Sequence, residues 1–225
     1  MKIIYILLFL IGTTSAVSEA PGLTDLIRDR PQLLDIIQRG DPLWAWLNSR
    51  FTNTNGQEVL WSDKGPNGPS HYLAGHTYDE FGRVVISARR LGDDGKPLGA
   101  EELISSVVFE LINGSHKDEF DRLARAAANR TISKDQFINS MAKVEFDSIM
   151  QDKQFAVDVW IPYAVSKHLP FLNDYWHKAV PEDFDQWLYV CRLSHNGYPD
   201  DIYGPFYDKL TKNKAINAGG MPTQR

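Results

Sequence analysis

Cysteine is almost absent from this sequence, which has Cys191 as its only cysteine among 225 residues. A single cysteine excludes an intramolecular disulfide, so the fold must be held together by its apolar core. Cys191 lies in the apolar segment 187–193, where a small buried side chain is more typical than a nucleophile. We therefore predict that Cys191 is buried and not catalytic.

Clusters of lysine and arginine are also missing, and the formal net charge is −5. Because nucleic-acid binding needs a basic surface that follows the phosphates, nucleic acid is not an expected partner. Low-complexity segments and internal repeats are absent too, while six tryptophans, nine tyrosines and eleven phenylalanines are present. This composition indicates a folded globular protein and not a disordered tail.

No apolar run is long enough to span a membrane, which takes about 20 apolar residues. The run at residues 3–11 follows Lys2 and is followed by the small residues 13–16. This order of charged, apolar and small residues is typical of a secretory signal peptide. We predict cleavage after Ala16, export to the periplasm or the extracellular space, and no stable membrane anchor on the remaining chain.

Sequence motifs of several enzyme classes are missing as well. The chain has neither a Gly-x-Ser-x-Gly turn nor a glycine-rich phosphate loop, and its acidic residues lack the spacing of a calcium loop. No cofactor is therefore expected. The triplets 113–115 and 129–131 match the N-glycosylation pattern, and their use depends on the host.

The remaining chain reads as one α+β domain, residues 17–211, followed by a polar, flexible tail at 212–225. Apolar spacing predicts short helices at 23–30, 31–39 and 42–51. Strands are expected at 58–62, 72–78 and 83–90, the last two joined by a hairpin turn at 79–82. The prediction is a small antiparallel sheet, about residues 58–90, flanked by helices in a mostly helical domain.

Several further helices follow the sheet. One is expected at 100–112, with Asn113-Gly114 as its end, and another at 120–129. Ser133 and Gln136 form a capping box that opens a long helix, whose pattern is interrupted at Pro162. A last strong helix is expected at 184–193.

The helix at 100–112 carries the most informative motif of the chain. Its residues Phe109-Glu110-Leu111-Ile112-Asn113 resemble the active helix of zincin-type metallopeptidases, in which His-Glu-x-x-His holds two zinc ligands and a general base. The resemblance implies a zincin-like fold, with Glu110 at the position of the general base. In the gluzincin branch a later helix supplies a third ligand, and the resemblance gives that position to Glu145.

Both histidine positions of the motif are changed. Phenylalanine at 109 cannot bind a metal, and the amide oxygen of Asn113 is a poor zinc ligand beside imidazole or thiolate. The resemblance therefore implies a peptidase scaffold without zinc. We expect a non-catalytic binding or structural protein whose ligand is a peptide, a protein or an envelope component, with an oligomeric state that the sequence leaves open.

Two alternatives stay open. One is an exported hydrolase that uses Glu110 as its general base at an unrecognised metal site, for which His71, His76 and His116 are the candidate ligands. The other is an unrelated helical domain in which the motif is a chance match. Three further histidines, at 168, 177 and 195, show no ligand spacing.

Helical geometry predicts which face of this helix is buried. At about 100° per residue, one arc is apolar and should face the core. Its members are Leu103, Ile104, Val107, Val108 and Leu111. Phe109 and Asn113 fall on the opposite, polar side together with Glu102, Ser105 and Ser106, and Glu110 falls at the boundary. Phe109 on a polar side predicts that another segment or a cleft covers it.

Overall fold

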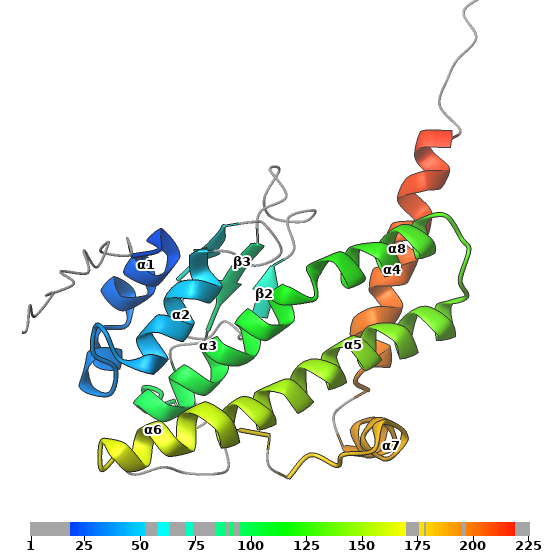
Figure 1. Ribbon diagram of the computed structural model, residues 1–225. Helices are drawn as coiled ribbons and strands as arrows, with labels where there is room; N and C mark the ends of the chain where they lie inside the picture. Colours follow the sequence, from blue (N-terminus) through cyan, green and yellow to red (C-terminus); the bar gives the residue numbers. More distant parts are fainter. Residues whose placement is uncertain are drawn as a thin grey trace, which may run out of the picture.

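The computed structural model describes residues 19–52, 58–63, 71–73, 84–88, 91, 95–169, 176–177, 179–194 and 197–218. Helices account for most of them, and one small sheet completes the domain (Figure 1). The predicted class, a mostly helical α+β fold with a small sheet, is confirmed. Within these residues no helix is both long and apolar enough to cross a membrane. The predicted signal peptide lies outside this part of the chain.

The first described segment forms three short helices, α1 (Pro21–Asp29), the 3₁₀ helix η1 (Pro31–Asp35) and α2 (Pro42–Thr52). The second is shorter than its predicted range of 31–39. Gly40 has a φ of +88° and lies between η1 and α2, where a left-handed backbone favours glycine.

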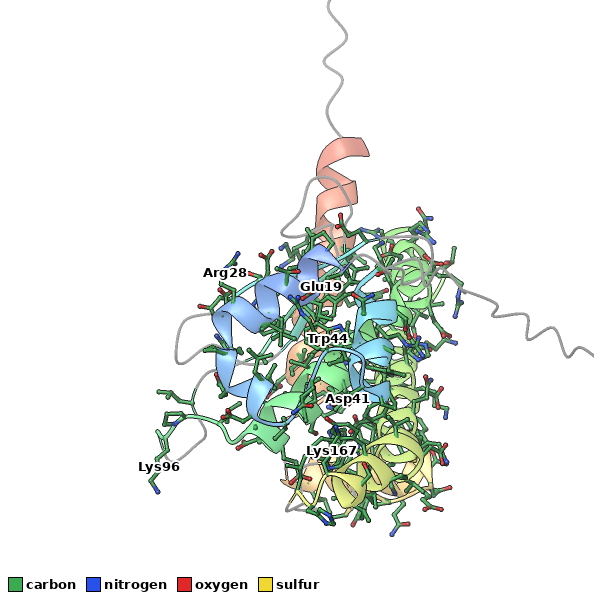
Figure 2. All side chains as sticks on the ribbon, turned by 60° about the vertical axis from the view of Figure 1, so that its left-hand side comes forward. Glu19, Arg28, Asp41, Trp44, Lys96 and Lys167 are labelled. Atoms are coloured by element: carbon green, nitrogen blue, oxygen red, sulfur yellow. The ribbon has the colours of Figure 1, made fainter. Side chains whose placement is uncertain are left out.

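A polar contact ties this segment to a distant part of the chain. Asp41, directly before α2, accepts hydrogen bonds from the Tyr163 hydroxyl at 2.8 Å and from Lys167 Nζ at 3.0 Å. Figure 2 shows Asp41 and Lys167 next to each other on this face. Both hydrogen bonds lower the pKa of Asp41, and the bond from Tyr163 has the larger effect. The contact fixes α2 against the helical segment at 161–167.

The sheet contains β1 (Val59–Trp61), β2 (His71–Leu73) and β3 (Val84–Ser87) in the order β1-β3-β2. β2 and β3 pair antiparallel as predicted, whereas β1 pairs with β3 in parallel, so the sheet is mixed. The purely antiparallel expectation assumed that strands adjacent in the chain are adjacent in the sheet. The expected turn at 79–82 lies outside the described residues.

Long helices make up the rest of the domain. Helix α3 (Ala100–Ser115) packs against β2 and β3, and α5 (Lys134–Phe155) runs beside α3 in the opposite direction (Figure 1). Between them lies α4 (Lys117–Ala128). The capping box that opens α5 is confirmed, because Ser133 and Gln136 each bind the other's backbone N–H.

Helix α5 does not end at a loop. It continues through the π-helical turn η2 (Ala156–Trp160) into α6 (Ile161–Ser166), where Pro162 lies in the first turn. The predicted interruption at Pro162 is thus a change of helix geometry just before the proline, whose missing N–H suits a helix start.

The last two helices are α7 (Phe184–Ser194) and α8 (Asp200–Ala218). Figure 1 shows α7 end-on at the edge of the molecule and α8 rising beside α4. Helix α8 includes the first residues of the segment 212–225 that the sequence analysis expected to be flexible.

Three apolar clusters form the core. The largest joins the sheet to α1, η1, α2, α3, residues 155–164 and Trp176, and it contains buried leucines from α1, η1 and α2. The second lies between α4, α5 and α8, and the third between α5 and α7. Cys191 belongs to the third cluster and is buried, as predicted.

Candidate functional site

Helix α3 continues through the residues that were expected to end it. Asn113 and Gly114 are both helical and buried, and the helix ends only at Ser115. Weak intrinsic helix propensity at these two residues is overridden by packing, because α5 covers this part of α3. The predicted stop at Asn113-Gly114 is therefore wrong.

The side of α3 that was expected to be polar and open is largely covered. Ser105 is 3% exposed, Glu110 4% and Asn113 7%. Phe109 is half-buried and packs against the third cluster, so the prediction that another segment covers it is confirmed. The predicted apolar arc is buried, as expected, but the pattern did not predict the burial of Ser105 and Asn113, because the helix lies between the sheet on one side and α5 on the other.

Asn113 has an unusual environment for an amide. Its Oδ1 is buried and has no hydrogen-bond partner among the described residues. Such an oxygen costs free energy, since it gave up water without gaining a donor. Asn113 is thus a polar residue held in place by its helix and not by a specific bond of that oxygen.

Glu145 on α5 lies in a bonded cluster and not at an open site. Its Oε2 accepts a hydrogen bond from the Tyr203 hydroxyl at 2.7 Å and another from the Tyr198 hydroxyl. Burial, with a further contribution from the charge on Glu145, raises the pKa of both phenols well above its ordinary value. The two phenols therefore stay protonated and act as donors to the carboxylate at every ordinary pH.

The structure brings Glu110 and Glu145 into one neighbourhood. The negative charge on Glu110 also raises the pKa of Tyr203, whose hydroxyl binds Glu145. We refer to Glu110, Glu145, Tyr198 and Tyr203 as the glutamate–tyrosine cluster. The sequence pointed to both glutamates but gave no sign of the two tyrosines, which lie 53 and 58 residues after Glu145.

The cluster has the chemistry of a structural tie. Two neutral phenols satisfy one carboxylate oxygen, and charge-assisted bonds of this kind are among the stronger hydrogen bonds in proteins. Buried phenols with raised pKa values are poor proton donors to a substrate at neutral pH. The arrangement can fix α5 and α8 in place more readily than it can activate water.

Of the three histidines proposed as alternative metal ligands, only His116 has a side chain within the described residues. Nε2 of His116, at the end of α3, lies 2.9 Å from Nε2 of the Gln151 side chain. His71 lies in β2, but its side chain and the whole of His76 fall outside the described residues. Among the residues that are described, no group of three or more histidine, cysteine, aspartate or glutamate side chains could hold a metal ion.

One pair that the sequence analysis passed over is well defined. Asp152 on α5 is fully buried, and its Oδ2 lies 2.8 Å from Nδ1 of His177. The His177 ring also contacts Phe109, with 4.8 Å between the ring centroids. Burial raises the pKa of Asp152, and the bond to His177 opposes that shift. Its Oδ1 has no partner in the described part of the chain.

The Asp152–His177 pair could not be read from the sequence. The two residues are 25 positions apart and belong to no spacing motif. His177 has a φ of +52°, a left-handed conformation that is uncommon outside glycine, asparagine and aspartate. The imidazole of His177 packs against the ring of Phe109.

Cys191 is not set up as a nucleophile. Burial, and then the charge on Glu145, raises the pKa of its thiol. A reactive cysteine needs a lowered thiol pKa, so the chemistry agrees with the predicted role as a small buried side chain.

Comparison with known proteins adds no relative: no family model matches the chain, and no curated protein or solved structure does so either. The fold and the site therefore define the class on their own terms. It is a mostly helical α+β domain in which Glu110 on α3 is buried and Glu145 on α5 is half-buried and bonded by two tyrosines.

Proposed function

We propose that this protein is an exported, zincin-like scaffold without catalytic activity, which serves as a binding or structural protein. The observation that carries the proposal is the use of the motif positions for packing. Phe109 lies against His177 and the third cluster, and Asn113 is 7% exposed. Side chains in these roles leave neither position free to hold a catalytic metal.

The burial of Glu110 supports the same proposal. A general base must reach the proton of a water molecule or a substrate, directly or through one water. Glu110 is 4% exposed and close enough to Tyr203 to affect its pKa. A carboxylate in this environment fits a structural role better than one in the activation of water.

The ligand that we propose is a peptide, a protein or an envelope component met after export. This part of the proposal rests on the signal peptide read from residues 1–16 and on the loss of both histidine ligands. It assigns the protein to recognition or architecture outside the cytoplasm and not to peptide hydrolysis.

The zinc content of the mature protein tests the loss of the metal site. Residues 17–225 would be produced without added metal, dialysed without chelator and measured by elemental mass spectrometry. We expect less than one zinc per ten chains. One zinc per chain would contradict the proposal and favour the hydrolase alternative, and a screen of peptide substrates would follow.

Replacing Glu110 by glutamine separates the two functions directly. The change keeps the shape but alters hydrogen bonding in a buried position, so we expect the free energy of unfolding to fall by about 1–3 kcal/mol. The control is Glu182→Gln, because Glu182 is 87% exposed and should change stability by less than about 0.5 kcal/mol. If Glu110→Gln instead abolished a hydrolytic activity without changing stability, Glu110 would be a general base.

A further inference from the structure

The two triplets that match the N-glycosylation pattern lie in opposite surroundings in the fold. Asn113 lies inside α3 and is 7% exposed. Asn129 lies at the end of α4, and it is exposed. An N-linked glycan is bulky and hydrophilic, so a folded protein can carry one only where the asparagine faces solvent. The structure therefore discriminates between two sites that the sequence alone leaves equivalent.

The backbone around Asn129 forms a tight turn that ends α4. Arg130 has a φ of +57°, and its N–H donates to the Ala127 carbonyl at 2.8 Å. The N–H of Thr131 donates to the Ala126 carbonyl at 3.0 Å. Two such bonds around a left-handed residue are a common way for a helix to end. The turn places the whole triplet where the chain leaves α4 for α5.

All three residues of this triplet are accessible. Asn129, Arg130 and Thr131 are each exposed. The hydroxyl of Thr131 donates to the Ala126 carbonyl at 3.1 Å, so the third residue of the pattern is held by the same turn. Figure 1 shows the connection from α4 to α5 at the edge of the molecule. A glycan on Asn129 can extend into solvent without displacing any element of the fold.

Asn113 lies where the folded chain has no room for a glycan. It is a residue of α3, and the helix continues through Gly114 to Ser115. The Ser115 hydroxyl donates to the Ile112 carbonyl at 2.6 Å, within the same helix. A glycan on a side chain that is 7% exposed would displace the closely packed atoms around it. The fold therefore excludes a glycan at Asn113.

We infer that Asn129, and not Asn113, is the residue at which this chain accepts an N-linked glycan in a secretory pathway that transfers such glycans. The co-reactant is an oligosaccharide linked to a lipid diphosphate. Nδ2 of Asn129 forms a bond to the anomeric carbon of the first sugar, and the bond from that carbon to the diphosphate oxygen breaks. The amide gives up one proton, and the lipid diphosphate leaves. The inference needs export but not the proposed scaffold role.

Secretion from a eukaryotic cell line tests the site. Residues 17–225 would follow a signal peptide of the host, so that export does not depend on residues 1–16. An N-glycosidase should lower the mass of the secreted protein by that of one glycan. Asn129→Gln and Thr131→Ala should each abolish this change. Thr131→Ser, which keeps the pattern, should retain it.

Ser115→Ala is the matched control, because it removes the other triplet without altering Asn113 and should leave the mass change intact. N-glycosidase converts a glycosylated asparagine to aspartate, so mass spectrometry of peptides locates the glycan. Secreted protein without a glycan, with a glycan at Asn113, or with glycans at both residues would overturn the inference. Zinc in a chain that is glycosylated at Asn129 would contradict the proposed function and leave this inference standing.

Discussion

The core around the sheet is buried and the glutamate–tyrosine cluster is partly buried, and the two are built from different chemistry. Around the sheet, leucine, isoleucine, valine and tryptophan side chains pack against one another, and Leu23, Leu47 and Ile86 are fully buried. In the cluster, two carboxylates and two phenols lie together; Glu110 is 4% exposed, and the other three residues are half-buried. Apolar contacts are non-directional, whereas each polar group in the cluster needs a partner at a defined place.

This difference between non-directional and directional contacts indicates which region specifies the arrangement of the helices. A wholly apolar core tolerates small shifts of its elements, because the stabilisation depends mainly on area removed from water. A buried carboxylate that loses a donor suffers the full cost of desolvation. The glutamate–tyrosine cluster should therefore fix the position of α8 against α5, while the core around the sheet supplies most of the stability.

Arg30 is a buried charged residue within the apolar region. It is 3% exposed, donates to the Ala88 carbonyl at 3.1 Å and pairs with Asp63 at 2.7 Å. Burial lowers the pKa of its guanidinium, and its Nε has no partner among the described residues. The Arg30 guanidinium thus joins the end of α1 to the residues that follow β1 and β3.

The largest expected effect is on the apolar side of the comparison. Trp160 is 1% exposed, stacks near Trp176 and donates its indole N–H to Glu101 at 2.8 Å. Trp160→Ala should lower the free energy of unfolding by about 3–5 kcal/mol, because it leaves a cavity and removes one of the two indole donors to Glu101. Urea unfolding measures the change. Val157→Ala, at a site 59% exposed in the same turn, should cost less than about 0.5 kcal/mol.

The next effect concerns the glutamate–tyrosine cluster. Tyr203→Phe removes one donor to Glu145, and loss of a bond to a charged group should cost about 1.5–3 kcal/mol in urea unfolding. Tyr189→Phe, at an exposed position, is the control and should have no effect at low protein concentration. A loss no larger for Tyr203 than for Tyr189 would mean that the cluster does not fix α8.

Tyr203→Phe should also change how the stability of the fold depends on alkaline pH. The phenol pKa of Tyr203 is raised in the folded protein, while an unfolded tyrosine ionises near pH 10. Its contribution to stability is therefore full below about pH 10 and is lost as pH rises further. Unfolding midpoints between pH 8 and 11 should fall more steeply for the original protein than for Tyr203→Phe.

A smaller effect is expected at Asp152, where a carboxylate is buried with only one partner. Its raised pKa means that the unfolded state releases this proton first, so stability falls as pH rises from about 4 through the raised value. Asp152→Asn abolishes that loss and keeps an acceptor for His177 Nδ1. We expect the variant to gain about 1 kcal/mol relative to the original protein between pH 4 and 7. A pH-independent difference would show that Asp152 does not have a raised pKa in the folded protein.

The smallest effect tests the start of α5, which carries residues of both regions. Ser133→Ala removes the side-chain acceptor for the Gln136 N–H and should cost about 1 kcal/mol. Thermal unfolding measures it, with Ser106→Ala as a mid-helix control whose hydroxyl bonds only its own helix. A larger cost at Ser106 would contradict the assignment of the capping box as the helix start.

Much of the fold could be predicted from local patterns. Apolar spacing located the short N-terminal helices, α3, α5 and α7, and the capping box placed the start of α5 at Ser133. The alternating residues of β3 indicated a strand with buried Val84 and Ile86. Strand order was different, because the parallel pairing of β1 with β3 depends on contacts between strands that are not neighbours in the chain.

The candidate site was predictable only in part. The motif identified Phe109, Glu110, Asn113 and Glu145. The burial of Glu110 and Asn113 depends on how α5 packs against α3, and the residue spacing within α3 does not predict that packing. By itself the sequence determined most of the helical segments up to α7, whereas α8 was not predicted. Only the tertiary structure decided that Glu145 binds Tyr198 and Tyr203 and that Phe109 meets His177. These contacts join residues 53 to 68 positions apart in the chain, so they are set by how whole helices pack and not by any local preference.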